Sequence, residues 1–149
     1  MKRLPDLPPF WTLCAWVLSL VISWVIPNPS WDSLGLRWLG LLWIILAFVS
    51  VAWSALVFFR YNTTIEPGQK PYKLITNGPF QFSRNPIYLS MVVATAGWVL
   101  WLGAAFGLAV IPVLWFILDR RFAALEEAVL RETFGEEAEA FFTRTRRWL

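Results

Sequence analysis

The chain has 149 residues, of which 58% are hydrophobic and 15% are charged, with a formal net charge of +3 and 11 tryptophans. A soluble fold of this length could not cover so much apolar surface, so the composition excludes an ordinary soluble domain and indicates a protein embedded in lipid. The single cysteine, Cys14, excludes a disulfide framework. Because the chain also has no histidine, zinc and haem sites lack their usual ligands and a triad with a histidine base is excluded. We expect neither a metal nor a nucleic acid as a partner.

Three long stretches of the sequence carry no charged side chain, at residues 10–26, 38–59 and 87–118. Each is long enough to cross a membrane as a helix. The third exceeds the roughly 20 residues of one crossing and contains several glycines, so we predict a helical hairpin with arms at 87–101 and 105–118 and its turn at 102–104. The sequence therefore predicts one all-α domain over residues 1–149, a polytopic membrane protein with four transmembrane helices.

The basic residues set the expected orientation, because Lys and Arg near helix ends stay on the cytoplasmic side. With four helices, all the basic residues except Arg37 fall on one side of the membrane. We therefore expect both termini in the cytoplasm and the chain in a bacterial-type inner, or plasma, membrane. The first span lacks a small-residue cleavage site and runs into Pro27-Asn28-Pro29, so we expect it to remain as a helix.

The first cytoplasmic segment, residues 60–86, is too rich in helix breakers to form a continuous helix. The breakers are Pro67, Gly68, Pro71, Gly78, Pro79 and Pro86. Apolar side chains that a solvated linker does not need also occur here, namely Leu74, Ile75, Phe80, Phe82 and, just beyond, Tyr88. We expect an ordered loop that packs over a cavity or on the helices. The alternative is a floppy connector.

The second cytoplasmic segment, residues 119–149, is predicted to be helical and to continue the last transmembrane helix as far as Phe134, because Gly135 is a natural stop. On a helical wheel, one face of this helix is apolar. That face comprises Phe122, Leu125, Val129 and Leu130.

Two neighbouring glutamates fall differently on this wheel. Glu126 lies within the apolar face, where a carboxylate is costly unless it has a partner. Its partner is either Arg84 or Arg120 in a structural ion pair, or a ligand at the membrane surface. Glu127 is expected to point away and to form an ordinary i,i+4 pair with Arg131.

The loop and the C-terminal segment together carry a family resemblance. The run NTTIEPGQKPYKLITNGPFQFSRNPIYL, followed by the hydrophobic hairpin and then EEAVLRETFGEEAEAFFTRTRRWL, resembles the isoprenylcysteine carboxyl methyltransferase and phospholipid methyltransferase group of integral membrane enzymes. This resemblance covers about residues 60–149 and implies an S-adenosylmethionine-dependent methyltransferase. Its cofactor pocket would lie on the cytoplasmic side, between the loop, the ends of the hairpin helices and the C-terminal segment.

The resemblance also implies the site residues. The catalytic residues would be Arg84, Asn85 and Glu126. The cofactor-binding residues would be Leu74, Ile75, Gly78, Pro79, Phe80, Arg84, Asn85, Pro86, Tyr88, Glu126 and Glu127. A pocket for S-adenosylmethionine needs a carboxylate, a cation and an aromatic or apolar slot, and these residues can supply all three. Asn85 stands where many members have His, and because Asn cannot titrate it is better suited to positioning than to proton transfer.

The acceptor stays open at this point. A prenylated cysteine carboxylate, a phospholipid amine, a small thiol or another lipophilic molecule could each enter laterally between the helices. Two rival functions also stay open. One is an NADPH-binding membrane protein similar to sterol reductases, which resemble the family in their C-terminal cofactor region but are much longer. The other is a noncatalytic membrane scaffold.

The basic end of the chain has two interpretations. It comprises Arg144, Arg146, Arg147 and Trp148. The first interpretation is docking on anionic lipid headgroups, where each basic side chain contributes about 1 kcal/mol. The second is closure over the cofactor or over a negative group of the acceptor.

Overall fold

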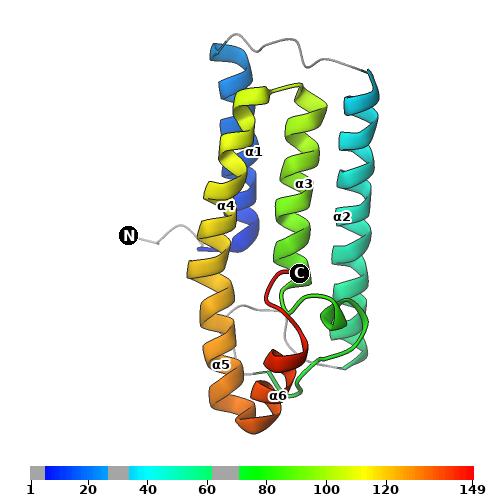
Figure 1. Cartoon of the computed structure of the whole chain (residues 1–149), viewed down its shortest axis with the longest axis vertical. Helices are drawn as coiled ribbons and strands as arrows, with labels where there is room; N and C mark the ends of the chain where they lie inside the picture. Colours follow the sequence, from blue (N-terminus) through cyan, green and yellow to red (C-terminus); the bar gives the residue numbers. More distant parts are fainter. Residues whose placement is uncertain (1–5, 27–33, 62–70) are drawn as a thin grey trace.

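In the computed structural model, which describes residues 6–26, 34–61 and 71–149, the chain is all-α, as the sequence predicts. Within these residues, helices lie side by side as a bundle (Figure 1): α1 (Pro8–Val25), α2 (Leu34–Arg60), α3 (Pro86–Leu102) and α4 (Val110–Leu118). Two more helices extend one end of this bundle, α5 (Ala124–Phe134) and α6 (Glu136–Arg144). The Pro27-Asn28-Pro29 run and residues 62–70 of the predicted loop lie outside the described residues.

Helices α1 and α2 are long and apolar enough to cross a membrane, and α3 is a shorter apolar helix. Helix α1 begins at Pro8, slightly before the predicted span, because a proline in the first turn loses no intrahelical hydrogen bond. Helix α2 already includes Leu34, ahead of the predicted start at Trp38. The charge at Arg37 does not end it, since this exposed side chain near the helix end can reach water. That all four bundle helices cross the membrane remains a prediction.

The predicted hairpin is present, with its turn at the predicted place. Helix α3 ends at Gly103, whose φ of 65° is the left-handed conformation that favours glycine. The amide of Ala104 donates to the carbonyl of Val99 at 3.2 Å and closes the turn. The second arm begins as a 3₁₀ helix, η2 (Ala105–Ala109), before it continues as α4.

Two glycines bring α2 and α3 into backbone contact. A Cβ atom added to Gly97 would lie 2.6 Å from the carbonyl oxygen of Gly40, and one added to Gly40 would lie 2.5 Å from the carbonyl oxygen of Gly97. Small residues at such crossings let membrane helices pack closely. The rest of α2 exposes many large apolar side chains, as expected for a helix that faces lipid.

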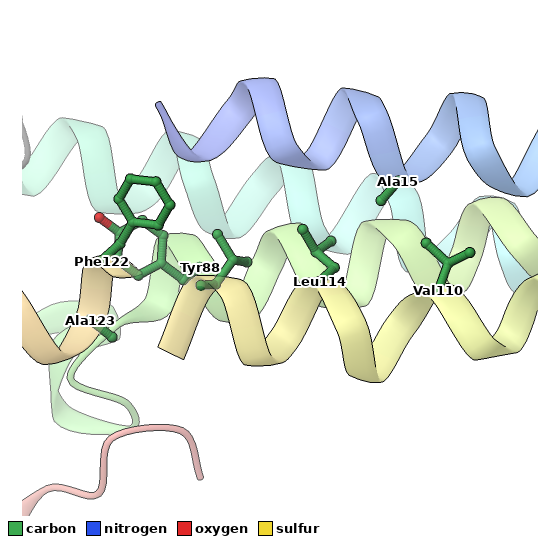
Figure 2. Packing of buried hydrophobic residues seen from close by; sticks show 7 residues of the cluster. Ala15, Tyr88, Val110, Leu114, Phe122 and Ala123 are labelled. Atoms are coloured by element: carbon green, nitrogen blue, oxygen red, sulfur yellow. The ribbon is translucent and has the colours of Figure 1, made fainter. Parts of the chain in front are cut away.

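Two apolar clusters form the core. The first joins α1, α3, α4 and the turn that follows α4 (Figure 2), and it consists of Ala15, Tyr88, Val110, Leu114, Leu118, Phe122 and Ala123. The second fixes the loop to α2 and α6 and consists of Val57, Leu74, Ile75, Phe80 and Phe141. The described part of the loop, residues 71–85, is therefore anchored, and the floppy-connector alternative is wrong for this part.

One irregularity separates α4 from α5. Residues Asp119–Ala123 form a π-helical turn, η3. Such a turn is wider than an α-helical turn, so it changes the direction in which the following side chains point. Helical π turns are rare and frequently lie at functional sites.

Candidate functional site

A cavity of about 190 Å³ lies where the polar end meets the apolar bundle. Segments far apart in the sequence contribute to its wall: the start of α1, the end of α2, the loop, the start of α3, and α5. The lining residues are Pro8, Pro9, Phe58, Phe80, Arg84, Asn85, Pro86, Ile87, Tyr88, Met91 and Glu126. The wall is thus mostly apolar or aromatic, with one basic and one acidic side chain among the described residues.

Glu126 and Tyr88 form a hydrogen-bonded pair on this wall. The Tyr88 hydroxyl donates to Oε1 of Glu126, and the Tyr88 side chain is buried. Burial raises the pKa of the Glu126 carboxyl above its ordinary value, and the hydrogen bond from Tyr88 opposes this change only in part. A carboxyl group with a raised pKa can exchange a proton nearer to neutral pH than an exposed one.

Arg84 supplies the basic side chain of the wall. Its guanidinium lies over the ring of Phe142, with Cζ 4.6 Å from the centroid, and Nη2 is 3.3 Å from Oε1 of Glu127. Its Nε is buried and has no hydrogen-bond partner among the residues that the structure describes. Burial lowers the pKa of Arg84, which Glu127 opposes, but an arginine stays protonated in proteins. A buried, charged donor without a partner is costly, so this atom is a candidate ligand contact.

Behind Arg84 lies a buried ion-pair cluster formed by Arg84, Asp119, Glu127 and Arg147. Arg147 donates to both carboxylate oxygens of Glu127, at 2.9 Å from Nε and 2.6 Å from Nη2, and its Nη1 donates to Oδ1 of Asp119 at 3.0 Å. Burial raises the pKa of Asp119, but hydrogen bonds from Trp148 and Arg147 outweigh it, and the pKa lies below its ordinary value. All four charges therefore have opposite partners.

The structure corrects the expectations for the two glutamates. Glu127 does not point to solvent: it is 2% exposed, and Arg131 instead pairs with Glu139 at 2.7 Å. Within the described residues Glu126 makes no ion pair with Arg84 or with any other basic residue, because its partner is the Tyr88 hydroxyl. The ion-pair interpretation of Glu126 is therefore wrong.

The error has a physical reason. The helical wheel assumed one regular helix with a single buried face, whereas the π turn interrupts the helix and α5 is covered on two sides. One side faces the cavity through Glu126, and the other faces the loop and the end of the chain through Glu127. Leu125, placed on the buried face by the wheel, is 61% exposed.

The end of the chain packs on the protein. The carbonyl of Arg146 accepts a hydrogen bond from the amide of Arg84 at 2.9 Å, and the carbonyl of Arg147 accepts one from the Ser83 hydroxyl at 3.0 Å and a longer one from Asn85 Nδ2 at 3.4 Å. The headgroup-docking interpretation is thus wrong for Arg147, whose side chain is committed to carboxylates. None of the residues Arg144, Arg146, Arg147 and Trp148 lines the cavity, and their closure over a ligand remains a prediction.

Part of the predicted site is brought together and part is not. The residues on the cavity wall are Phe80, Arg84, Asn85, Pro86, Tyr88 and Glu126. Leu74 and Ile75 are instead buried in the core cluster under the loop. Gly78, with φ 62°, lines a different pocket beside α2, and the adjacent Pro79 is buried. Glu127 lies behind Arg84.

Sequence reasoning missed several residues of the site. Pro8 and Pro9 precede the first span, and Phe58 and Met91 read as ordinary lipid-facing or core positions, so no sequence signal marked them. Asp119 did carry a signal, because it is an acidic residue directly after an apolar span and needs a partner there.

Comparison with known proteins identifies the family of this chain. The sequence profile of the phospholipid methyltransferase family matches residues 36–137, which is more than half of the chain. The chain belongs to the phospholipid methyltransferase family. An uncharacterised protein of Haemophilus influenzae is 30% identical over 63 residues, which are 42% of this chain and 100% of that protein. No solved structure matches.

The family match extends from α2 to the start of α6 and includes Arg84, Tyr88 and Glu126. Membership in the phospholipid methyltransferase family makes the chain a phospholipid methyltransferase-like protein. Together with the apolar helices it indicates a location in the membrane. Helix α1 and the end of the chain with Arg147 lie outside the match.

Proposed function

We propose that the protein is an S-adenosylmethionine-dependent methyltransferase that acts at the cytoplasmic face of the membrane on a lipophilic acceptor. The acceptor would be similar to an isoprenylcysteine carboxylate or to a phospholipid. One observation carries the proposal: Arg84, with a buried donor that lacks a partner among the described residues, and Glu126 line one largely apolar cavity. Family membership supports the reaction type.

The residues fit the groups that S-adenosylmethionine presents. Its carboxylate suits the guanidinium of Arg84, and its ammonium or ribose hydroxyls suit the Glu126 carboxylate. Phe58 and Phe80 offer an aromatic wall for the adenine. The cavity is smaller than the 300–1,000 Å³ typical of ligand pockets, so binding requires it to widen.

Methyl transfer requires little proton transfer by the side chains of this protein. When bound, the cofactor supplies a methyl group on a sulfonium, and the protein aligns the acceptor with it and excludes water. A carboxylate acceptor is already ionised at neutral pH and needs no base. For an amine or thiol acceptor, Glu126 is the group that would take the proton, while Asn85 positions.

The entry route for a lipophilic acceptor is an apolar groove of about 280 Å³ that adjoins the cavity. Its walls are α1 and α2 and its floor is α3, and it shares Pro9 and Met91 with the cavity. Leu13 and Phe48 on its walls are largely exposed, as at a lipid-facing opening. An aliphatic chain in this groove would place its polar head beside Glu126.

The two rival functions fit the cavity less well. NADPH carries several phosphate charges, and Arg84 is the one basic residue among the described residues of the cavity wall. A scaffold would gain nothing from a buried arginine donor left without a partner, which costs stability. Both rivals are outcomes of the same experiment.

The first prediction concerns cofactor binding. Purified wild type in detergent, titrated calorimetrically, should bind S-adenosylmethionine and not NADPH. Glu126→Gln and Arg84→Ala should each weaken this binding by about tenfold or more, because each removes one partner of a desolvated charged contact. Matched controls are Glu137→Gln and Arg144→Ala, which change exposed side chains of α6 and should leave the affinity unchanged.

Other results would decide against the proposal. Binding of NADPH alone would favour the reductase-like function. Binding of neither ligand, with a folded protein, would favour the scaffold. Wild-type affinity in both cavity variants would show that Arg84 and Glu126 do not hold the cofactor.

A further inference from the structure

Arg147 lies outside the family match and does not line the cavity, yet it makes the strongest contacts of the ion-pair cluster. It is the basic residue that holds both oxygens of the Glu127 carboxylate, at 2.9 and 2.6 Å. Arg84 touches the same carboxylate through one longer contact of 3.3 Å. Two arginines therefore compete for one buried carboxylate, and Arg147 has the better geometry.

The competition has a consequence for Arg84. A guanidinium next to a free carboxylate normally pairs through two parallel hydrogen bonds. Here Arg147 already occupies the bidentate position on the two oxygens of Glu127, so Arg84 reaches this carboxylate only through the single contact of 3.3 Å. Its Nε stays without a partner among the described residues, and its side chain stays on the cavity wall. Phe142 supports the guanidinium from one face, with Cζ 4.6 Å from the ring centroid.

The backbone at Arg147 also helps to hold Arg84 in place. Its carbonyl accepts hydrogen bonds from Ser83 and Asn85, the residues on both sides of Arg84, and the adjacent carbonyl of Arg146 accepts the amide of Arg84 itself. The same residue that occupies Glu127 thus also holds the backbone from which Arg84 projects.

We propose that Arg147 is a positioning residue: by occupying Glu127 it prevents Arg84 from forming a bidentate pair with that carboxylate and keeps Arg84 available to the anionic group of a ligand in the cavity. This inference rests on the proposed function, because the ligand it concerns is the carboxylate of S-adenosylmethionine. It adds a residue that neither touches the ligand nor belongs to the matched part of the family.

The test is a mutant cycle on the full-length protein in detergent, with S-adenosylmethionine affinity measured by calorimetry and folding by thermal unfolding. Arg147→Ala should weaken binding by about tenfold or more, since Arg84 then turns to Glu127. Arg147→Ala combined with Glu127→Gln should restore the affinity to within about threefold of wild type, because the competing charge is gone. Arg144→Ala, an exposed change on α6, is the matched control.

A second pair of variants tests the inference in case Arg147→Ala does not fold. Arg147→Lys keeps the charge, but one ammonium cannot hold both oxygens of Glu127 and also Asp119. It should lose part of the affinity, and adding Glu127→Gln should recover it.

The outcomes separate the two proposals. Wild-type affinity in Arg147→Ala overturns this inference alone. The inference is also overturned if the double variant Arg147→Ala with Glu127→Gln is folded but still binds weakly. Arg147 would then act only by holding the backbone around Arg84. A folded wild type that binds no S-adenosylmethionine overturns the proposed function and this inference together.

Discussion

Glu126 and Glu127 are adjacent in sequence and differ completely in environment. Glu126 borders the cavity and takes one neutral donor, the Tyr88 hydroxyl. Glu127 is 2% exposed and is neutralised by Arg147 and Arg84. Glu126 is therefore placed to bind a ligand in the cavity, whereas Glu127 supports the structure.

The raised pKa of Glu126 predicts a pH dependence of stability. The folded state holds the Glu126 proton more tightly than the unfolded chain, whose carboxyl has the ordinary pKa of 4.5. The contribution of Glu126 is therefore largest below that pH and is lost as pH rises through the folded pKa. The free energy of unfolding of wild type relative to Glu126→Gln should fall over this range, with a slope of at most about 1.4 kcal/mol per pH unit, and the melting temperature should fall with it.

This prediction is checked by thermal unfolding of both proteins in detergent between about pH 4 and pH 8. The difference between the two proteins cancels the titration of Asp119 and Asp6. A difference that is constant or grows with pH would contradict a raised pKa at Glu126.

The resemblance implies that Arg84, Tyr88 and Glu126 belong to one site, and the structure places all three on the cavity wall. It did not predict the burial of Glu127, because that depends on Arg147, which folds back from the end of the chain. Contacts of this kind connect distant segments, and no local pattern in the sequence encodes them.

At the scale of the elements, a close contact between two helices joins the part of α2 near its start to the part of α3 near its end. Gly40 and Gly97 leave no room for a side chain between the two backbones.

Gly97→Ala should therefore destabilise the protein by about 1–3 kcal/mol, because its Cβ would lie 2.6 Å from the backbone oxygen of Gly40 and the helices must move apart. The matched control is Gly35→Ala, also on a bundle helix, where nothing lies within 4 Å of the new Cβ. That change should be neutral or stabilising by up to about 1 kcal/mol. Equal unfolding temperatures for both variants in the same detergent would contradict the close crossing.

Local chemistry made most elements predictable. The hairpin followed from the length of one apolar stretch and from Gly103, and the end of α5 followed from Gly135. The π turn at Asp119–Ala123 was not predictable, because its residues suit an ordinary α-helix. A helical wheel drawn across this turn therefore assigns the wrong side chains to the buried face.

At the scale of the whole molecule, the described helices run up and down so that the start of α2 and the α3–α4 turn lie at one end and α5 and α6 at the other (Figure 1). The ion-pair cluster and the cavity gather at the end with α5 and α6. That this end faces the cytoplasm remains a prediction.

The orientation is tested by single cysteines in a Cys14→Ser background. Leu34→Cys, at the start of α2, should react with a membrane-impermeant maleimide on intact cells, and Glu137→Cys, on α6, should react only after permeabilisation. Both native side chains are exposed, so the new thiols are accessible. The Cys14→Ser protein alone is the unlabelled control. Reaction of both sites from the same side would rule out the proposed crossings, because α2, α3 and α4 would put the two sites on opposite sides of the membrane.

Because the cavity and its charged residues lie at one end of the bundle, the proposed enzyme would take lipids from a single leaflet. Acceptors in the opposite leaflet would have to be flipped before they could be modified. The product would be released into the leaflet from which the acceptor came. The compositional asymmetry that results would be set by the direction in which the chain is inserted, without any later sorting step.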